Sequence, residues 1–118
     1  MLWSWPGSTI TRVIDGDSLT ARLTRDIGFH GIVTFEQRLR LWGINTPPVK
    51  SVQGAAATAL VTELVTGAAV GIDTVKPYKY GDEWMAVITL PDGRDVATAL
   101  IDAGLAVAWD GRGPRPGG

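Results

Sequence analysis

The groups that could do chemistry in this sequence are carboxylates and arginines set in or beside strand-like segments. Asp15 and Asp17 flank a glycine directly after an apolar segment, and Arg38 and Arg40 alternate along a later one. Carboxylates are the ligands that hard divalent cations prefer, and arginine pairs well with phosphate. Two kinds of site therefore deserve testing, a metal–carboxylate centre and a phosphate-binding surface.

Cysteine and histidine chemistry is nearly absent from the chain. The 118 residues contain no cysteine and one histidine, His30, so disulfides, thiolate catalysis, zinc–cysteine sites and iron–sulfur clusters are excluded. We expect His30 to be exposed in a loop and idle. With 45% hydrophobic and 19% charged residues, the sequence is typical of one ordinary globular domain.

The charge balance and the apolar segments bear on partners and location. No apolar run approaches the roughly 18 residues of a membrane span, and no secretory signal pattern is visible. We expect no membrane partner and a cytoplasmic location, in the host cytoplasm if the protein is phage-encoded. The net charge is −1, from eleven basic and twelve acidic residues. A non-specific nucleic-acid binder usually has a basic surplus, so this balance slightly favours a pure protein-interaction role.

The hydrophobic pattern predicts a β-rich α+β fold. Alternation and β-branched residues predict strands, and helical spacing predicts two helices. The expected strands cover residues 9–14, 18–24, 32–42, 68–75 and 83–90, with a loop over 26–31 and helices over 51–67 and 95–104. This order fits a small, partly open five-stranded oligonucleotide-binding (OB) barrel with two flanking helices. We expect residues 1–8 to be a lead-in, 9–110 to form the domain, and the Gly/Pro/Arg-rich 111–118 to be a disordered tail.

Four segments in register resemble the thermonuclease (staphylococcal nuclease-like) family. They are residues 11–19 (TRVIDGDSL), 38–47 (RLRLWGINTP), 79–81 (KYG) and 92–106, from Asp-Gly to Leu-Ala. The similarity spans residues 9–111. The resemblance implies an OB barrel that binds a strand of DNA or RNA. It also implies calcium-dependent hydrolysis of phosphodiester bonds.

The resemblance also assigns roles to individual positions. It places a first metal carboxylate at Asp17, a second metal-ligand position at Asn45, and a backbone carbonyl ligand at Thr46. It places the arginine that clamps the phosphate at Arg40 and a tyrosine near the phosphate at Tyr80. A Ca²⁺ ion would be the cofactor of such a site, although Asn45 brings an oxygen without the negative charge that calcium favours.

Two further positions depart from the family pattern. The glutamate that activates water falls on Pro48, which has no acid–base group. The second arginine falls on Asp82, beside Glu83, where negative charge would oppose the transition state. The resemblance therefore predicts a degenerate catalytic site with weak or no phosphodiesterase activity. The chain would then act as a binding module for single-stranded nucleic acid or for a protein partner.

Other interpretations of the same residues stay open. An active divalent-metal-dependent endo- or exonuclease would need a rearranged site, in which Asp82 or Glu83 rebuilds a carboxylate pair with Asp17. Alternatively, Asp17 closes a β-turn without any metal, because Asp-Gly-Asp suits a turn. The arginines could bind phosphate or form surface ion pairs with Asp17 or Glu36. The expected nucleic-acid contacts are Arg38, Arg40, Tyr80 and Trp109.

Five tryptophans are many for this length. We expect Trp42 and Trp84 to fill the barrel or its helix contact. Trp109 lies near the position where the family places base-stacking aromatics, although a packed aromatic is the alternative. Trp3 and Trp5 lie in the terminal segment, where we expect them to be exposed, and exposed tryptophans would mark a protein contact or a dimer surface.

Overall fold

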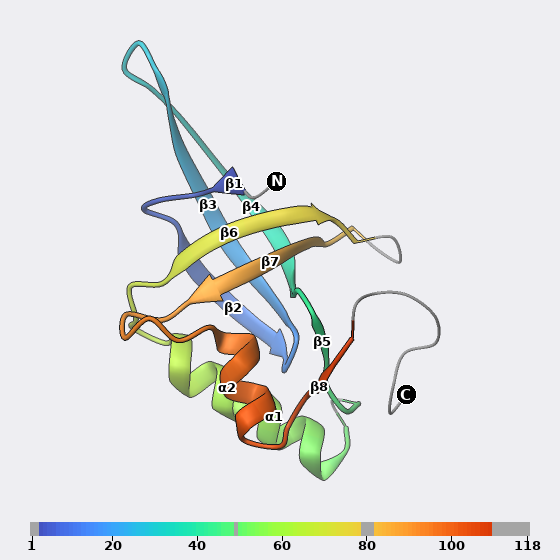
Figure 1. Ribbon diagram of the computed structural model, residues 1–118. Coiled ribbons are helices and arrows are strands. Elements are labelled where there is room, and N and C mark those ends of the chain that lie inside the picture. Colours follow the sequence, from blue (N-terminus) through green and yellow to red (C-terminus); the bar gives the residue numbers. More distant parts are fainter. Residues whose placement is uncertain (1–2, 49, 79–81, 110–118) are drawn as a thin grey trace.

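A computed structural model describes residues 3–48, 50–78 and 82–109. Its main element is a six-stranded sheet with the order β1-β6-β7-β4-β3-β2 (Figure 1). The strands are β1 (Trp3–Ser4), β2 (Thr9–Asp15), β3 (Ser18–Gly28), β4 (Gly31–Leu41), β6 (Gly71–Pro77) and β7 (Trp84–Thr89). A separate pair joins β5 (Ile44–Asn45) to β8 (Val107–Ala108). The predicted β-rich α+β class is confirmed.

The sheet is open in the described part of the chain. β2, β3 and β4 form an antiparallel meander, β6 and β7 are antiparallel, and β4 pairs with β7 in parallel. β1 and β2 are the two edges, and no ladder joins them within the described ranges. The six-stranded sheet therefore differs from the predicted five-stranded barrel by one strand and by the lack of a closing ladder.

The β3–β4 hairpin extends well beyond the rest of the sheet (Figure 1). Gly28 pairs with Gly31, so Phe29 and His30 alone make the turn, with φ of 53° and 62°. Left-handed residues suit a two-residue hairpin turn because they follow the twist of the strands. The predicted loop over 26–31 is therefore wrong, since the strands continue to the two glycines. His30 is exposed, as expected.

Two helices lie together at the end of the sheet opposite the hairpin tip (Figure 1). α1 (Val52–Val65) begins where the Ser51 hydroxyl accepts the Gly54 N–H at 2.9 Å, and α2 (Val96–Asp102) begins where Asp95 accepts from Ala97. Both predicted helices are confirmed within slightly shorter bounds. Neither one, nor any other helix in the described ranges, is long and apolar enough to cross a membrane.

The main core joins these helices to the sheet. Its largest fully buried side chains have at most 1% exposure and come from β3, β4, β7 and both helices: Leu19, Leu41, Val61, Ile88, Val96 and Leu100. A second cluster lies further along the sheet, toward the hairpin, and contains Leu23, Leu39, Ile72 and Trp5. Both clusters contain side chains of β3 and β4, the strands at whose ends the candidate site begins.

The N-terminal residues belong to the sheet. β1 pairs with β6, with Trp3 opposite Thr74. Part of the predicted lead-in therefore forms the sixth strand of the sheet. Trp5 is buried, and its indole N–H donates to the Thr74 hydroxyl at 2.8 Å, so its predicted exposure is wrong. Trp3 is exposed as expected, at 52%. Residues 111–118, predicted to be a tail, lie outside the described residues.

Candidate functional site

The candidate site begins at the Asp15-Gly16-Asp17 turn between β2 and β3. The Asp17 N–H donates to Asp15 Oδ1 at 3.1 Å, as expected for a carboxylate that closes a turn. Gly16 is buried against α1, where an added Cβ would lie 2.7 Å from the Ala57 Cβ. The turn is therefore clamped between strand and helix, and it directs the Asp17 side chain inward.

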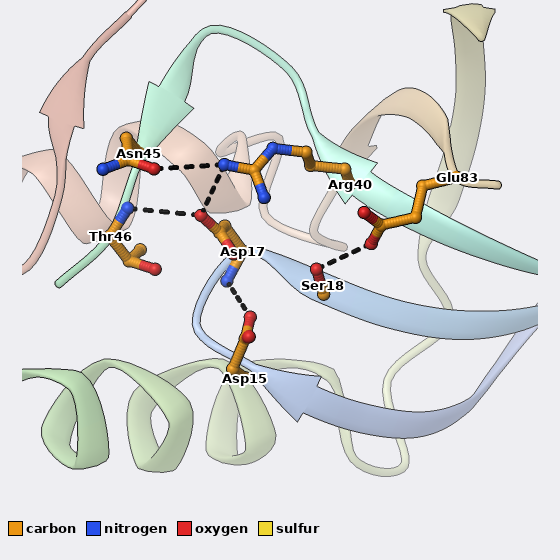
Figure 2. A network of polar contacts seen from close by, with 7 residues as sticks. All are labelled: Asp15, Asp17, Ser18, Arg40, Asn45, Thr46 and Glu83. Carbon is orange, nitrogen blue, oxygen red and sulfur yellow. Dashed lines mark hydrogen bonds and ion pairs between the residues drawn. The ribbon is translucent and has the colours of Figure 1, made fainter. Parts of the chain in front are cut away.

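Asp17 and Arg40 form a buried ion pair. Arg40 Nη2 lies 3.0 Å from Asp17 Oδ2, and the two side chains are 5% and 4% exposed (Figure 2). The backbone supports this placement, because Ser18 pairs with Arg40 across β3 and β4 and the Leu41 N–H donates to the Asp17 carbonyl at 2.8 Å. The pairing of Arg40 with Asp17 was one of the open alternatives, and the structure places it in the interior.

The chain then bends back to add two more groups. Gly43 has a φ of 87°, a left-handed conformation that favours glycine, and β5 follows directly. Arg40 Nη2 also donates to Asn45 Oδ1 at 3.1 Å, and the Thr46 N–H donates to Asp17 Oδ2 at 3.3 Å (Figure 2). The structure thus brings together Asp17, Arg40, Asn45 and Thr46, which the resemblance assigns to one site.

An aromatic cluster borders the arginine. The guanidinium carbon of Arg40 lies 4.7 Å from the ring centroid of Tyr78, which packs with Met85 and Trp109. Trp109 is 8% exposed and therefore packed rather than presented for stacking. Tyr80 lies outside the described residues. Tyr78 was not predicted at this position, although two tyrosines separated by one residue were a signal that either could face the arginine.

Asp15 is the group whose ionisation this arrangement changes most clearly. Partial burial, the side-chain hydrogen bond with Asp17 and the charge of Asp17 raise the pKa of Asp15 to about 6, and they outweigh the backbone hydrogen bonds from Asp17 and Ser18, which lower it. Burial is the largest cause, because it disfavours the charged carboxylate. The neighbouring negative charge acts in the same direction.

The acids after β6 lie differently from each other. Glu83 Oε2 accepts the Ser18 hydroxyl at 2.7 Å, which places this carboxylate beside the residue that follows Asp17 (Figure 2). Asp82 is exposed, and its carbonyl accepts from the Gln37 amide at 2.9 Å. Glu83 rather than Asp82 is therefore the acid nearer to the site.

Pro48 has a structural role at the edge of the site. Its carbonyl accepts the Ser51 N–H at 2.9 Å and the Ser51 hydroxyl at 2.6 Å. An added Cβ on Gly54 would lie 1.8 Å from the same oxygen. Pro48 therefore docks the segment after β5 onto the first turn of α1, and its side chain offers no proton-transfer group.

The fit of the four residues to calcium can be judged from their donors. Asp17 Oδ2 already accepts from Arg40 and from the Thr46 N–H, and Asn45 Oδ1 accepts from Arg40. Within the described ranges, no group of three histidine, cysteine or acidic side chains could hold a metal ion. Two of the oxygens that would bind Ca²⁺ are thus already bound to the Arg40 guanidinium, so these residues as arranged fit calcium poorly.

Exposed arginines lie on the same sheet face as the buried pair. Arg12, Thr20 and Arg38 are neighbours across β2, β3 and β4, and we call these three residues the arginine row. Both arginines are exposed, and neither forms an ion pair with another described residue. Trp42, expected inside, is 43% exposed just after β4, whereas Trp84 packs against the second core cluster as expected.

Two comparisons with known proteins found no match. No protein-family model matches the sequence, and no curated protein matches it. The resemblance to thermonucleases therefore stays a prediction that depends on the four segments and on the residues they contain.

Proposed function

We propose that this chain is a nucleic-acid-binding module with a thermonuclease-like OB architecture and a degenerate catalytic site, with weak or no phosphodiesterase activity. The order β2-β3-β4-β7-β6 and the parallel β4–β7 ladder are compatible with a partly open OB barrel. The bound partner would be single-stranded DNA or RNA.

The observation that carries the proposal is the buried ion pair of Arg40 with Asp17. A phosphate clamp needs a guanidinium that reaches the ligand, whereas this one is 5% exposed and has its carboxylate partner at 3.0 Å. Separating such a pair leaves an uncompensated buried charge, which typically costs about 3–5 kcal/mol. A phosphate or metal would have to supply that energy, and Pro48 supplies no base to activate water.

Binding without cleavage is supported by the arginine row. Arg12 and Arg38 flank Thr20 on one face and have no carboxylate partner among the described residues. Two guanidiniums held on β2 and β4, with β3 between them, can contact phosphates of one nucleic-acid strand, and exposed arginine suits such contacts. A protein with a net charge near zero can bind a strand of nucleic acid through a local surface of this kind.

The binding half of the proposal is tested by fluorescence anisotropy with labelled oligothymidylate and oligouridylate. We expect affinity to fall steeply between about 50 and 200 mM salt, and Arg38→Ser to reduce the slope of log K against log salt by about 0.7. Arg94→Ser is the matched control, because Arg94 is equally an exposed arginine but pairs with Asp92 at 2.8 Å in the turn before α2. Absence of salt-dependent binding would overturn the proposal and favour a protein-interaction role.

The catalytic half is tested by incubating the protein with single-stranded DNA, RNA and plasmid in calcium, magnesium or manganese. We expect no metal-dependent cleavage above that of an Asp17→Ala variant. One observation supports the alternative, an active nuclease: the Glu83 carboxylate is hydrogen-bonded to Ser18, beside Asp17. Cleavage that chelator, Asp17→Ala and Glu83→Gln each abolish would establish the alternative and refute the degenerate site.

A further inference from the structure

Three tryptophans gather where β1 joins the edge of the sheet. Trp3 lies on β1, Trp5 follows it, and Trp84 begins β7. With Thr74, Val75, Lys76 and Pro77 of β6, they line a cavity of about 350 Å³, which we call the tryptophan pocket. This volume lies in the range of small-molecule sites, and the walls are mainly apolar.

Two walls of the tryptophan pocket are fixed before any ligand arrives. The Trp5 indole N–H is bonded to Thr74, and its ring centroid lies 6.2 Å from that of Trp84. Phe35 packs edge-on against both rings, at 5.5 Å from Trp5 and 5.7 Å from Trp84. Because these rings are already immobilised, a ligand would lose little binding free energy to ordering them.

The third wall is accessible. Trp3 is 52% exposed, although β1 is held to β6 by its ladder. An indole that is half exposed on a fixed strand is a surface on which another planar ring can stack.

The charges at the tryptophan pocket are positive. Lys76 lines the cavity. Arg25 lies beside it, with its guanidinium carbon 4.7 Å from the Trp3 ring and 4.8 Å from the Trp5 ring, and donates to the Ser4 carbonyl. Neither cation forms an ion pair with a carboxylate in the described ranges. Asp73 is bonded to the Ser4 hydroxyl and, by strand alternation, faces the opposite side of the sheet from Trp3 and Thr74. The pocket therefore matches a ligand that is both aromatic and anionic.

We propose that the tryptophan pocket binds a base of single-stranded nucleic acid, stacked on Trp3, with the adjoining phosphate next to Lys76. This inference rests on the proposed function and names a base-binding site apart from the arginine row. A basic proline-rich peptide, the other common occupant of aromatic grooves, would meet Arg25 and Lys76 with the wrong charge.

The test is a titration of the full chain with oligothymidylate, followed by anisotropy and by the NMR signals of the indole N–H groups. We expect the Trp3 signal to shift, and Trp3→Ala to weaken binding about 5- to 150-fold, the range of base–aromatic stacking. Trp3→Phe should retain most of the affinity because it keeps an aromatic face. Trp42→Ala is the matched control, since Trp42 is similarly exposed but lies outside the pocket.

The outcomes separate this inference from the proposed function. Salt-dependent binding that Arg38→Ser weakens and Trp3→Ala leaves unchanged would overturn the base-binding pocket and retain the proposed function. Loss of affinity in Trp3→Leu equal to that in Trp3→Ala, with rescue by Trp3→Phe, would support stacking. An oligonucleotide that fails to bind would overturn both. Preferential binding of a proline-rich peptide at the Trp3 signal would overturn the pocket's assignment alone.

Discussion

Arg40 and Arg25 differ in what surrounds their guanidiniums. Arg40 is buried, pairs with Asp17 at 3.0 Å and bonds to Asn45, so its charge is satisfied within the protein. Arg25 contacts the rings of Trp3 and Trp5, donates to the Ser4 carbonyl, and has no carboxylate partner among the described residues. The arginine at the position that the resemblance gives to the phosphate clamp is therefore the less exposed of the two. A motif indicates which residue to test, whereas the groups that surround the residue determine what it can bind.

The largest predicted effect tests whether the Asp17–Arg40 network is a closed structural unit. Arg40→Met leaves Asp17 buried without its countercharge, so we expect the free energy of unfolding to fall by about 3–5 kcal/mol. Urea denaturation measures this change. Asp17→Asn combined with Arg40→Met should recover much of the loss, because no charge is then left buried.

The exposed pair of Arg22 and Glu36 is the matched control for that experiment. Its atoms are 3.7 Å apart, and both side chains are 57% exposed. Arg22→Met should cost less than about 1 kcal/mol, since exposed ion pairs contribute little. A similar cost for the two arginine substitutions would show that Arg40 is not buried in solution, and the site would then be open to phosphate.

A second prediction concerns the segment that carries Asn45 and Thr46 into the network. Glycine to alanine within a helix ordinarily stabilises by about 0.5–1 kcal/mol. At Gly54 we expect the opposite, a loss of about 2 kcal/mol from overpacking, because an added Cβ would lie 1.8 Å from the Pro48 carbonyl oxygen. Thermal unfolding measures it, and the exposed Ala56→Gly shows the ordinary helix propensity. A stabilised Gly54→Ala would mean that the segment after β5 is not docked on α1.

Much of the fold could be predicted from the sequence, because alternation and caps report local preference. The meander of β2, β3 and β4 and both helices follow from apolar periodicity and from Ser51 and Asp95 as caps. The sixth strand could not be predicted, since two residues carry no periodicity. β1 depends on pairing with β6, which is about 70 residues away in sequence, and on burial of the Trp5 ring.

The site shows a similar division. The resemblance named Asp17, Arg40, Asn45 and Thr46 together, and the structure gathers them through the β3–β4 register and the turn at Gly43. From the sequence, the ion pair of Arg40 with Asp17 was only one of the alternatives, because it depends on the burial of both side chains. Burial of a guanidinium is a property of the packed molecule that residue spacing does not report.

A third prediction uses Asp15, whose pKa is raised from 3.8 to about 6. The folded state binds the proton more tightly than the unfolded state, so stability falls as pH rises from about 4 to about 6 and stays low above it. Asp17 is the charged neighbour in its turn, and α1, packed on β2, carries Glu63 as its one charged residue.

Asp15→Asn should remove this pH dependence and keep the acceptor for the Asp17 N–H. We expect it to stabilise the protein at about pH 7 by about 1.5 kcal/mol and to have little effect near pH 4. This value is about half of the free energy that corresponds to the whole pKa change, because Asp15 is only partly buried. Urea denaturation at both pH values measures the difference. Asp102→Asn, at an exposed acid on α2, is the control. An equal gain at both pH values would assign the effect to the turn rather than to ionisation.

The smallest predicted effect on stability separates folding from binding at the tryptophan pocket. Trp3 is half exposed, and its removal ends one contact with Arg25 while the β1 backbone keeps its ladder. Trp3→Ala should therefore cost only about 0.5–1 kcal/mol. Trp5→Ala, which empties a buried site and leaves Thr74 without its indole donor, should cost about 3–5 kcal/mol. Equal costs in urea denaturation would make Trp3 part of the core, and any loss of nucleic-acid affinity in Trp3→Ala would then reflect unfolding. Unequal costs would leave a tryptophan that the fold does not need, which is what a binding surface requires.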